Sequence, residues 1–133
     1  MKVKVVLSML IALLALSALV GGAAQAKGGN LFGAIAVAIK EPGFGFSFNF
    51  PTREAAEERA MTECEIRAEG NSCRNIAWVR NGCAAVALRR RSDGKATRIV
   101  WAVAKTKQKA VDRAKEELGS GRGKKSLIFT CTD

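Results

Sequence analysis

The chain has 133 residues, with 22 Lys and Arg against 12 Asp and Glu, which gives a formal net charge of +10. It contains four Cys and no His or Tyr. This length is that of one domain. Because His is the usual general base near neutral pH and the commonest metal ligand, its absence removes most catalytic triads and most zinc sites from consideration. Composition therefore favours a binding protein over an enzyme, and we expect neither a cofactor nor a metal site.

The first 26 residues have the pattern of a signal peptide. Two Lys near the N-terminus precede an apolar run, Val5–Val20, and small residues follow up to Ala24-Gln25-Ala26, a typical cleavage site. The run is shorter than the roughly 20 residues that span a bilayer, which makes a retained N-terminal anchor the weaker alternative. We predict a cleaved signal peptide (residues 1–26) and an exported mature chain (residues 27–133).

All four cysteines lie in the predicted mature chain, at Cys64, Cys73, Cys83 and Cys131. An even number in a small exported chain indicates two disulfides, for which three pairings exist. A zinc site of four thiolates or a redox-active dithiol would need short spacings such as C-x-x-C. The cysteines here are separated by 9, 10 and 48 positions. We therefore expect structural disulfides.

The first predicted elements form a β-hairpin. Gly33–Ile39 is a continuous apolar run, and residues 44–50 alternate Phe with smaller residues, which is the period of a strand. The segment between them, Lys40-Glu41-Pro42-Gly43, is typical of a turn. We expect the four Phe to lie in the core, because an aromatic platform that stacks nucleic-acid bases is the rarer use of such a stripe.

A helix is predicted from Thr52, a good N-cap residue, towards a break at residues 69–72. Small residues recur at every fourth position and form one row along the helix, so that its axis can lie close to a sheet. The row consists of Ala56, Ala60 and Cys64. A strand over Arg74–Val79 and the strong hairpin signal Asn81-Gly82 follow.

The second half repeats this order, and Thr106–Ala114 aligns with Thr52–Ala60 at an offset of 54 residues. Its predicted elements are strands at Cys83–Arg90 and Ala96–Ala104, a turn at Ser92-Asp93-Gly94, the helix, a flexible exit at Gly119–Gly123 and a strand at Leu127–Cys131. Chance similarity of two Ala-rich helices is the alternative, but the matched order favours an internal duplication. The predicted fold is α+β: two strand-strand-helix-strand repeats, about residues 31–81 and 82–132, forming an antiparallel sheet with two helices packed on it.

The duplication also suggests how the cysteines pair. Cys64 ends the first helix and Cys73 begins the next strand, whereas the equivalent positions of the second half carry no Cys. We therefore predict a Cys64–Cys73 bridge inside the first half. Cys83 and Cys131 then pair, and they tie the first strand of the second half to the last strand of the chain.

Several motifs along the chain together resemble a known family. They are Gly33-Ala-Ile-Ala36, Thr52-x-x-x-Ala56-x-x-x-Ala60 with Cys64, Cys73-Arg74, Trp78-x-x-Asn81-Gly82-Cys83-Ala84, Trp101, Thr106-x-x-x-Ala110-x-x-x-Ala114 and Cys131-Thr132. In this order they resemble domain-of-unknown-function family 4189, a family of small exported bacterial proteins. The resemblance implies secretion or a periplasmic location and a disulfide-held repeat fold, and it transfers no catalytic residue.

Positive charge is concentrated in the second half. Residues 27–88 carry seven basic and seven acidic groups, whereas residues 89–125 carry 13 basic and four acidic groups. We predict a partner-binding surface there. Its candidate residues are Arg89, Arg90, Arg91, Lys95, Arg98, Lys105, Lys107 and Lys109. The alternative is a solvated basic face that aids solubility.

Together these features predict an exported, disulfide-stabilised binding protein that acts by protein–protein interaction, for example as an inhibitor, immunity or effector protein with an acidic partner. The alternative is a basic surface protein that binds anionic lipid, cell-wall polymer or nucleic acid. Glutamates of the first helix could supply a carboxylate pair as in glycosidases, but the arginines between them indicate solvated surface. Since no nucleophile and base can be paired, we predict no catalytic residue.

Overall fold

A computed structural model of the protein describes residues 29–133, so the predicted signal peptide lies outside the described residues. The elements are β1 (Phe32–Ala38), β2 (Phe44–Phe50), α1 (Arg53–Arg67), β3 (Cys73–Arg80), β4 (Cys83–Arg90), β5 (Ala96–Ala104), α2 (Lys107–Leu118) and β6 (Lys124–Cys131). The order strand-strand-helix-strand occurs twice, which confirms the predicted α+β repeat pattern. Within residues 29–133, neither helix is long and apolar enough to cross a membrane.

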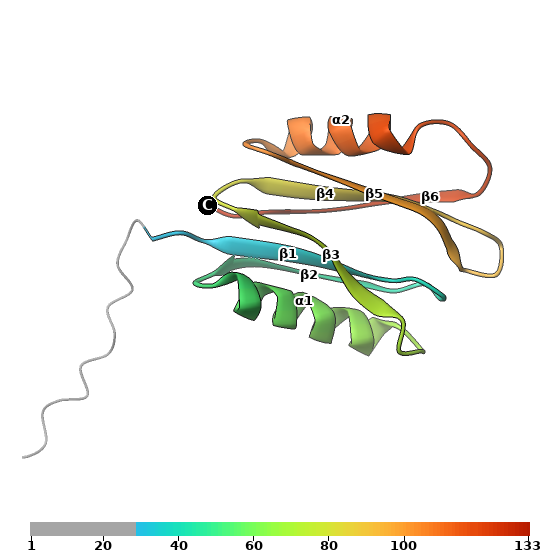
Figure 1. The fold of residues 1–133 in the computed structure, drawn as a ribbon, viewed down its shortest axis with the longest axis horizontal. Helices are drawn as coiled ribbons and strands as arrows, with labels where there is room; N and C mark the ends of the chain where they lie inside the picture. Colours follow the sequence, from blue (N-terminus) through green and yellow to red (C-terminus); the bar gives the residue numbers. More distant parts are fainter. Residues whose placement is uncertain (1–28) are drawn as a thin grey trace, which may run out of the picture.

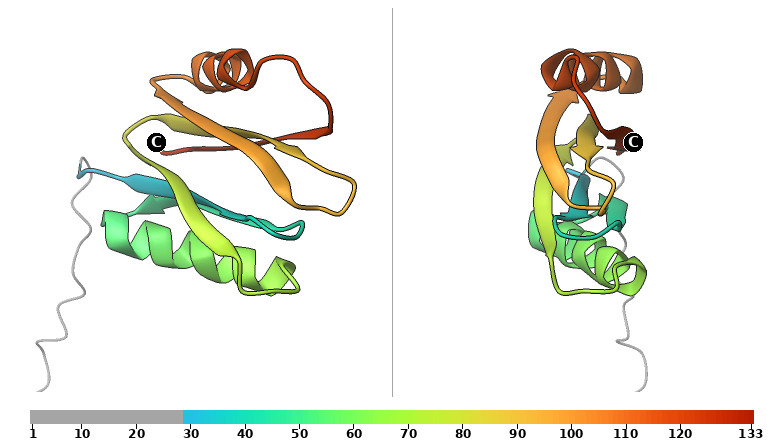
Figure 2. Two further views of the ribbon diagram at one scale, coloured as in Figure 1. Left: turned by 45° about the vertical axis from the view of Figure 1, so that its right-hand side comes forward. Right: turned by 90° about the vertical axis from the view of Figure 1, so that its right-hand side faces the viewer.

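The elements form four layers, with a helix on each outside and two sheets between them (Figures 1 and 2). The strand order is β2-β1-β3 in one sheet and β5-β4-β6 in the other, and all neighbours are antiparallel. The second sheet therefore repeats the strand order of the first. The sequence pattern predicted antiparallel sheet under two helices, and the structure divides that sheet into two that face each other.

Rows of alanine hold each helix against its own sheet. Ala34, Ala36 and Ala38 of β1 form a buried cluster with Ala56, Ala60 and Cys64 of α1. In the second half, Ala85 and Ala87 of β4 meet Ala110, Ala114 and Leu118 of α2 in the same way. Small side chains on both surfaces let the helix axis approach the strands, as the four-residue spacing predicts.

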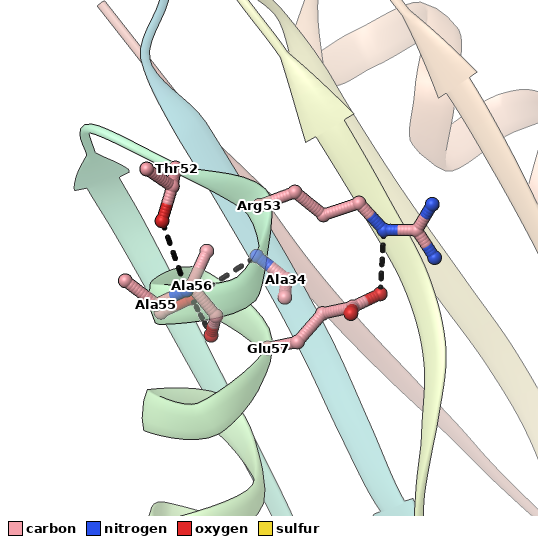
Figure 3. Close-up of polar contacts among 7 residues, drawn as sticks. Ala34, Thr52, Arg53, Ala55, Ala56 and Glu57 are labelled. Atoms are coloured by element: carbon pink, nitrogen blue, oxygen red, sulfur yellow. Dashed lines mark hydrogen bonds and ion pairs between the residues drawn. The ribbon is translucent and has the colours of Figure 1, made fainter.

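Both helices begin at the predicted threonine caps. The Thr52 hydroxyl accepts a hydrogen bond from the Ala55 N–H at 3.2 Å, and the Thr106 hydroxyl accepts one from the Lys109 N–H at 3.4 Å. Figure 3 shows the first of these caps beside the paired Arg53 and Glu57 side chains. Each cap satisfies an N–H group that has no partner within its helix.

The larger core lies between the two sheets. Ile35 and Val37 of β1 alternate with the helix-facing alanines, and they pack with Val86 and Leu88 of β4 and with Ile128 of β6. Because successive side chains of a strand point to opposite faces, β1 and β4 each bury both of their faces. This explains why β1 and β4 are apolar without interruption.

Both predicted disulfides are present. Cys64–Cys73 joins the end of α1 to the start of β3, and Cys83–Cys131 joins β4 to β6. The first bridge therefore fastens a helix to its sheet, and the second fastens the last strand to the centre of the second sheet.

The hairpin predicted at Asn81-Gly82 is wrong, although the turn exists. Asn81 adopts a left-handed backbone with φ of 50°, as an Asn in a tight turn can. However, β3 pairs with β1, and β4 lies between β5 and β6 in the other sheet. With both sides of β4 occupied, β3 cannot join its ladder. The turn therefore carries the chain from one sheet to the other.

Three of the four phenylalanines of β2 are exposed, which contradicts their expected place in the core, whereas Phe50 is half-buried and packs against the cluster between β1 and α1. Phe44, Phe46 and Phe48 expose 39%, 38% and 56% of their surface, whereas Gly45 and Ser47 are buried. Since β2 is an edge strand of a three-stranded sheet, its small residues face α1 and its aromatic side lies beyond the inter-sheet core. The periodicity correctly predicted a strand but not which of its faces is covered.

Candidate functional site

Arg89, predicted to bind a partner, is buried and completes the end of α2. It is 9% exposed, and its Nη2 group donates hydrogen bonds to the carbonyls of Leu118 at 2.9 Å and Gly119 at 3.1 Å. The last carbonyls of a helix have no partner within the helix, and Arg89 supplies two of these bonds. A Cβ on Gly121 would lie 2.4 Å from Arg89 Nη1, so the glycine-rich loop closes over this guanidinium.

Arg90 is also buried, at 8% exposure, and it joins the turns of both halves. Its Nη1 group donates to the carbonyls of Glu41 at 2.9 Å and Gly94 at 2.8 Å, and its Nη2 group donates to that of Ala38 at 2.8 Å. Burial lowers the pKa of Arg90, and the charge of nearby Glu41 opposes this shift. The expectation that Arg89 and Arg90 are surface cations is therefore wrong. Their guanidinium groups are buried because they donate hydrogen bonds to backbone carbonyls in the turns and at the end of α2.

The other predicted partner-binding residues are exposed. They are Arg91, Lys95, Arg98, Lys105, Lys107 and Lys109. Lys95 and Lys105 flank the nine-residue strand β5, which separates them by about 30 Å at some 3.3 Å per residue. The structure therefore splits the predicted surface into a group at the β4–β5 turn and a group at the start of α2.

Arg91 and Arg98, both in the group at the turn, already interact with neighbouring side chains or backbone. Arg91 forms an ion pair with Asp93, and the pKa of Asp93 is lowered, chiefly by the hydrogen bond from the Lys95 N–H. Arg98 donates from Nη2 to the Glu117 carbonyl at 2.9 Å near the end of α2. At the turn, therefore, part of the positive charge is compensated locally.

A groove that the charge pattern does not predict lies where β3 and β5 are in contact at one flank of the sandwich. It has a volume of about 490 Å³, and we call it the Trp groove. Its lining includes Ile76, Trp78, Arg80, Trp101 and Val103, together with Arg53 and Glu57 of α1. Trp78, Trp101 and Val103 expose 39%, 55% and 37% of their surface. Both strands are edge strands, so nothing within residues 29–133 covers these side chains fully.

Trp78 is held in place from two sides. The Arg53 guanidinium lies 4.5 Å from its ring centroid, within the range of a cation–π interaction. Arg53 Nε also donates to Glu57 Oε1 at 2.9 Å, which fixes the guanidinium (Figure 3). The ring of Phe32 lies 6.3 Å from that of Trp78. The indole is therefore held in position by contacts within the domain.

The second half contains an equivalent pair of a cation and an aromatic ring. Lys107 begins α2 as Arg53 begins α1, and its ammonium lies 3.9 Å above the ring of Phe129 in β6. Phe129 pairs with helix-facing Ala85, just as Trp78 pairs with helix-facing Ala34. This equivalence gives Lys107 a partner at a helix N-terminus, where the helix dipole disfavours a cation. Alignment of the strands of the two halves, and not only of their helices, would have predicted the contact between Lys107 and Phe129 from the sequence.

Comparison with known proteins gives one match. A family described as a domain of unknown function (DUF4189) matches residues 32–131, a span that runs from the first strand to the last. No curated protein and no solved structure matches the chain. Within residues 29–133, no group of three or more His, Cys, Asp or Glu is placed to hold a metal ion.

Proposed function

The chain belongs to the DUF4189 family, and we propose that it is an exported binding protein whose Trp groove takes an acidic protein partner. The observation that carries the proposal is a pair of half-exposed tryptophans in a groove rimmed by cations. Trp and Arg are the residues that most often dominate the binding energy of protein interfaces. Exposed apolar patches with a polar rim commonly mark such interfaces.

The charges around the groove favour an acidic partner. Arg53 and Arg80 line the groove, and Lys105 follows β5. Glu57 is the one acidic residue of the lining, and its carboxylate is bonded to Arg53. The surplus of positive charge would speed association with an acidic surface, while the indoles would supply buried contact.

The two disulfides support a location outside the cytoplasm. Such bridges persist in oxidising compartments such as the periplasm and the extracellular space. A small domain also gains from them, because about 100 residues bury only part of the surface that the unfolded chain exposes.

Polyanion binding is the second candidate, and the exposed lysines at the start of α2 favour it. Lys105, Lys107 and Lys109 are all exposed in that short segment. Contacts with a polyanion weaken steeply and log-linearly as salt increases, because binding releases counterions. A protein interface with a buried aromatic centre loses much less affinity between low and physiological salt.

The decisive experiment is a pull-down from envelope extract with the disulfide-bonded protein at low and physiological salt. We expect one protein in stoichiometric amount at both salt concentrations. Replacing Trp78 or Trp101 with Ala should weaken its binding at least 30-fold, as about 2 kcal/mol is lost per anchor residue. Phe48→Ala is the matched control for Trp101 and Phe46→Ala that for Trp78, since each Phe is as exposed as its counterpart but lies on β2. The proposal would be contradicted by salt-labile capture of lipid or nucleic acid. It would also be contradicted if the control variants lost as much binding as the Trp variants.

A further inference from the structure

A second cavity, of about 450 Å³, lies where the β1–β2 turn, the β4–β5 turn and the first residues of β6 meet. We call it the turn cleft. Its lining includes four cations and no carboxylate. The cations are Arg67, Arg90, Arg91 and Lys124. None of these residues lines the Trp groove, so the two sites can be tested separately.

Two of the four cations have acidic partners and two do not. Arg67 forms an ion pair with Glu63 at 3.0 Å, and Arg91 pairs with Asp93. Within residues 29–133, neither Arg90 nor Lys124 has a carboxylate within 4.0 Å. Glu41 acts on Arg90 electrostatically but stays beyond ion-pair distance. The lining of the cleft therefore has an excess of positive charge, part of it on the buried guanidinium of Arg90, which Glu41 compensates only from outside ion-pair distance.

Arg90 also has hydrogen-bonding capacity left for a ligand. Its three hydrogen bonds all go to backbone carbonyls, whereas a guanidinium has five N–H donors. Burial of a guanidinium is costly, the charge of Glu41 offsets only part of that cost, and an anion bonded to Arg90 in the cleft would reduce it further. Hydrogen bonds between a guanidinium or ammonium and an anion are also among the strong ones.

Apart from Ser92 and Ser126, the other side chains that line the cleft are apolar. Phe44 and Leu127 are exposed by 39% and 36%, and Leu88 and Ile128 are buried beneath them. The volume is typical of small-molecule sites, which are mainly apolar with a few polar groups that fix orientation. A simple inorganic anion would bind the cations but would make no contact with these apolar side chains.

We propose that the turn cleft binds an amphipathic anion, that is, a carboxylate or phosphate head on an apolar chain. The head lies at Arg90 and Lys124, and the chain covers Phe44 and Leu127. This site is independent of the Trp groove, so failure of either proposal leaves the other standing.

The first test compares four ligands by calorimetry on the disulfide-bonded protein. We expect decanoate and decyl phosphate to bind at least tenfold more tightly than acetate, which lacks the chain, and decanol, which lacks the charge. The tighter of the two anions then distinguishes a fatty-acid head from a phospholipid-type head. Equal affinity for decanol and decanoate, or no binding of either anion at millimolar concentration, would overturn the proposal.

The second test locates the ligand. Lys124→Met keeps the length of the side chain but removes its charge, and we expect it to weaken decanoate binding about tenfold. Lys125→Met is the matched control, because the Lys125 ammonium donates to the Gly119 carbonyl at 3.2 Å and does not line the cleft. Both lysines are exposed, so neither change threatens the fold. Equal effects of the two variants would also overturn the proposal.

Discussion

Three consecutive arginines show how position decides the role of a residue. Arg89 bonds to the end of α2, Arg90 bonds to carbonyls of both turns, and Arg91 points to solvent beside Asp93. Arg89 and Arg90 end β4, the central strand of its sheet, where neighbouring elements crowd around them. Side-chain chemistry alone cannot distinguish these three environments.

At this scale we predict that Arg90→Met lowers the free energy of unfolding by about 2–4 kcal/mol. The substitution leaves the carbonyls of Ala38, Glu41 and Gly94 without the donors that now satisfy them. Arg91→Met should change stability by less than about 0.5 kcal/mol, because its ion pair is exposed. Urea unfolding of the two variants checks this prediction. If Arg90→Met changed the free energy of unfolding as little as Arg91→Met, the buried hydrogen bonds of Arg90 would not stabilise the protein.

At the scale of elements, the helices pack through surfaces with very small side chains. Ala and Gly on the strands meet mainly Ala on the helices, so the backbones come close, and the larger Val111 and Leu118 enter the contact only on α2. Gly45 of β2 is the tightest point. A Cβ there would lie 2.1 Å from the Ala60 carbonyl oxygen and 2.4 Å from the Cys64 nitrogen.

We therefore predict that Gly45→Ala destabilises the protein by about 3 kcal/mol, because the added methyl group meets the backbone of α1 rather than a movable side chain. Thermal unfolding should show a decrease in Tm of roughly 12–20 °C for a domain of this size. Gly70→Ala is the control, since its Cβ would meet the Glu41 carboxylate at 3.0 Å, a flexible group that can move aside. A small effect of Gly45→Ala would show that α1 shifts away easily.

At the scale of the whole molecule, two similar halves share one core. Each half covers one face of its sheet with its own helix, and the two sheets cover each other. A single half would expose Ile35 and Val37, or Val86 and Leu88, to water. Neither half is therefore expected to fold alone, which is the physical reason for a duplicated chain to remain one domain.

The two disulfides should stabilise the folded domain to different extents. Cys83–Cys131 closes a separation of 48 residues and Cys64–Cys73 one of 9, so chain entropy predicts about 4 and about 2.5 kcal/mol of stabilisation. We expect the double variant Cys83→Ala/Cys131→Ala to lose more stability than Cys64→Ala/Cys73→Ala in denaturant unfolding without reductant. The opposite order would show that the helix-to-sheet bridge stabilises the native state directly.

Local patterns in the sequence were sufficient to predict the helices and strands, the helix caps and the disulfides. Thr52 and Thr106 cap the helices, four-residue spacing identifies the packed rows, and comparison of the halves predicts both disulfides. These features depend on residues close in sequence or on the repeat. The charge pattern predicted the exposure of six of the eight candidate cations, but not that β5 separates them into two groups.

The tertiary structure alone decided which faces are covered. Strand periodicity shows that Phe44, Phe46 and Phe48 share a side, but only the three-stranded width of the sheets leaves that side exposed. The Trp groove joins β3 to β5, and the turn cleft joins two turns to β6, so both depend on the packing of one sheet against the other. That packing is set by contacts between distant residues, and no local pattern records them.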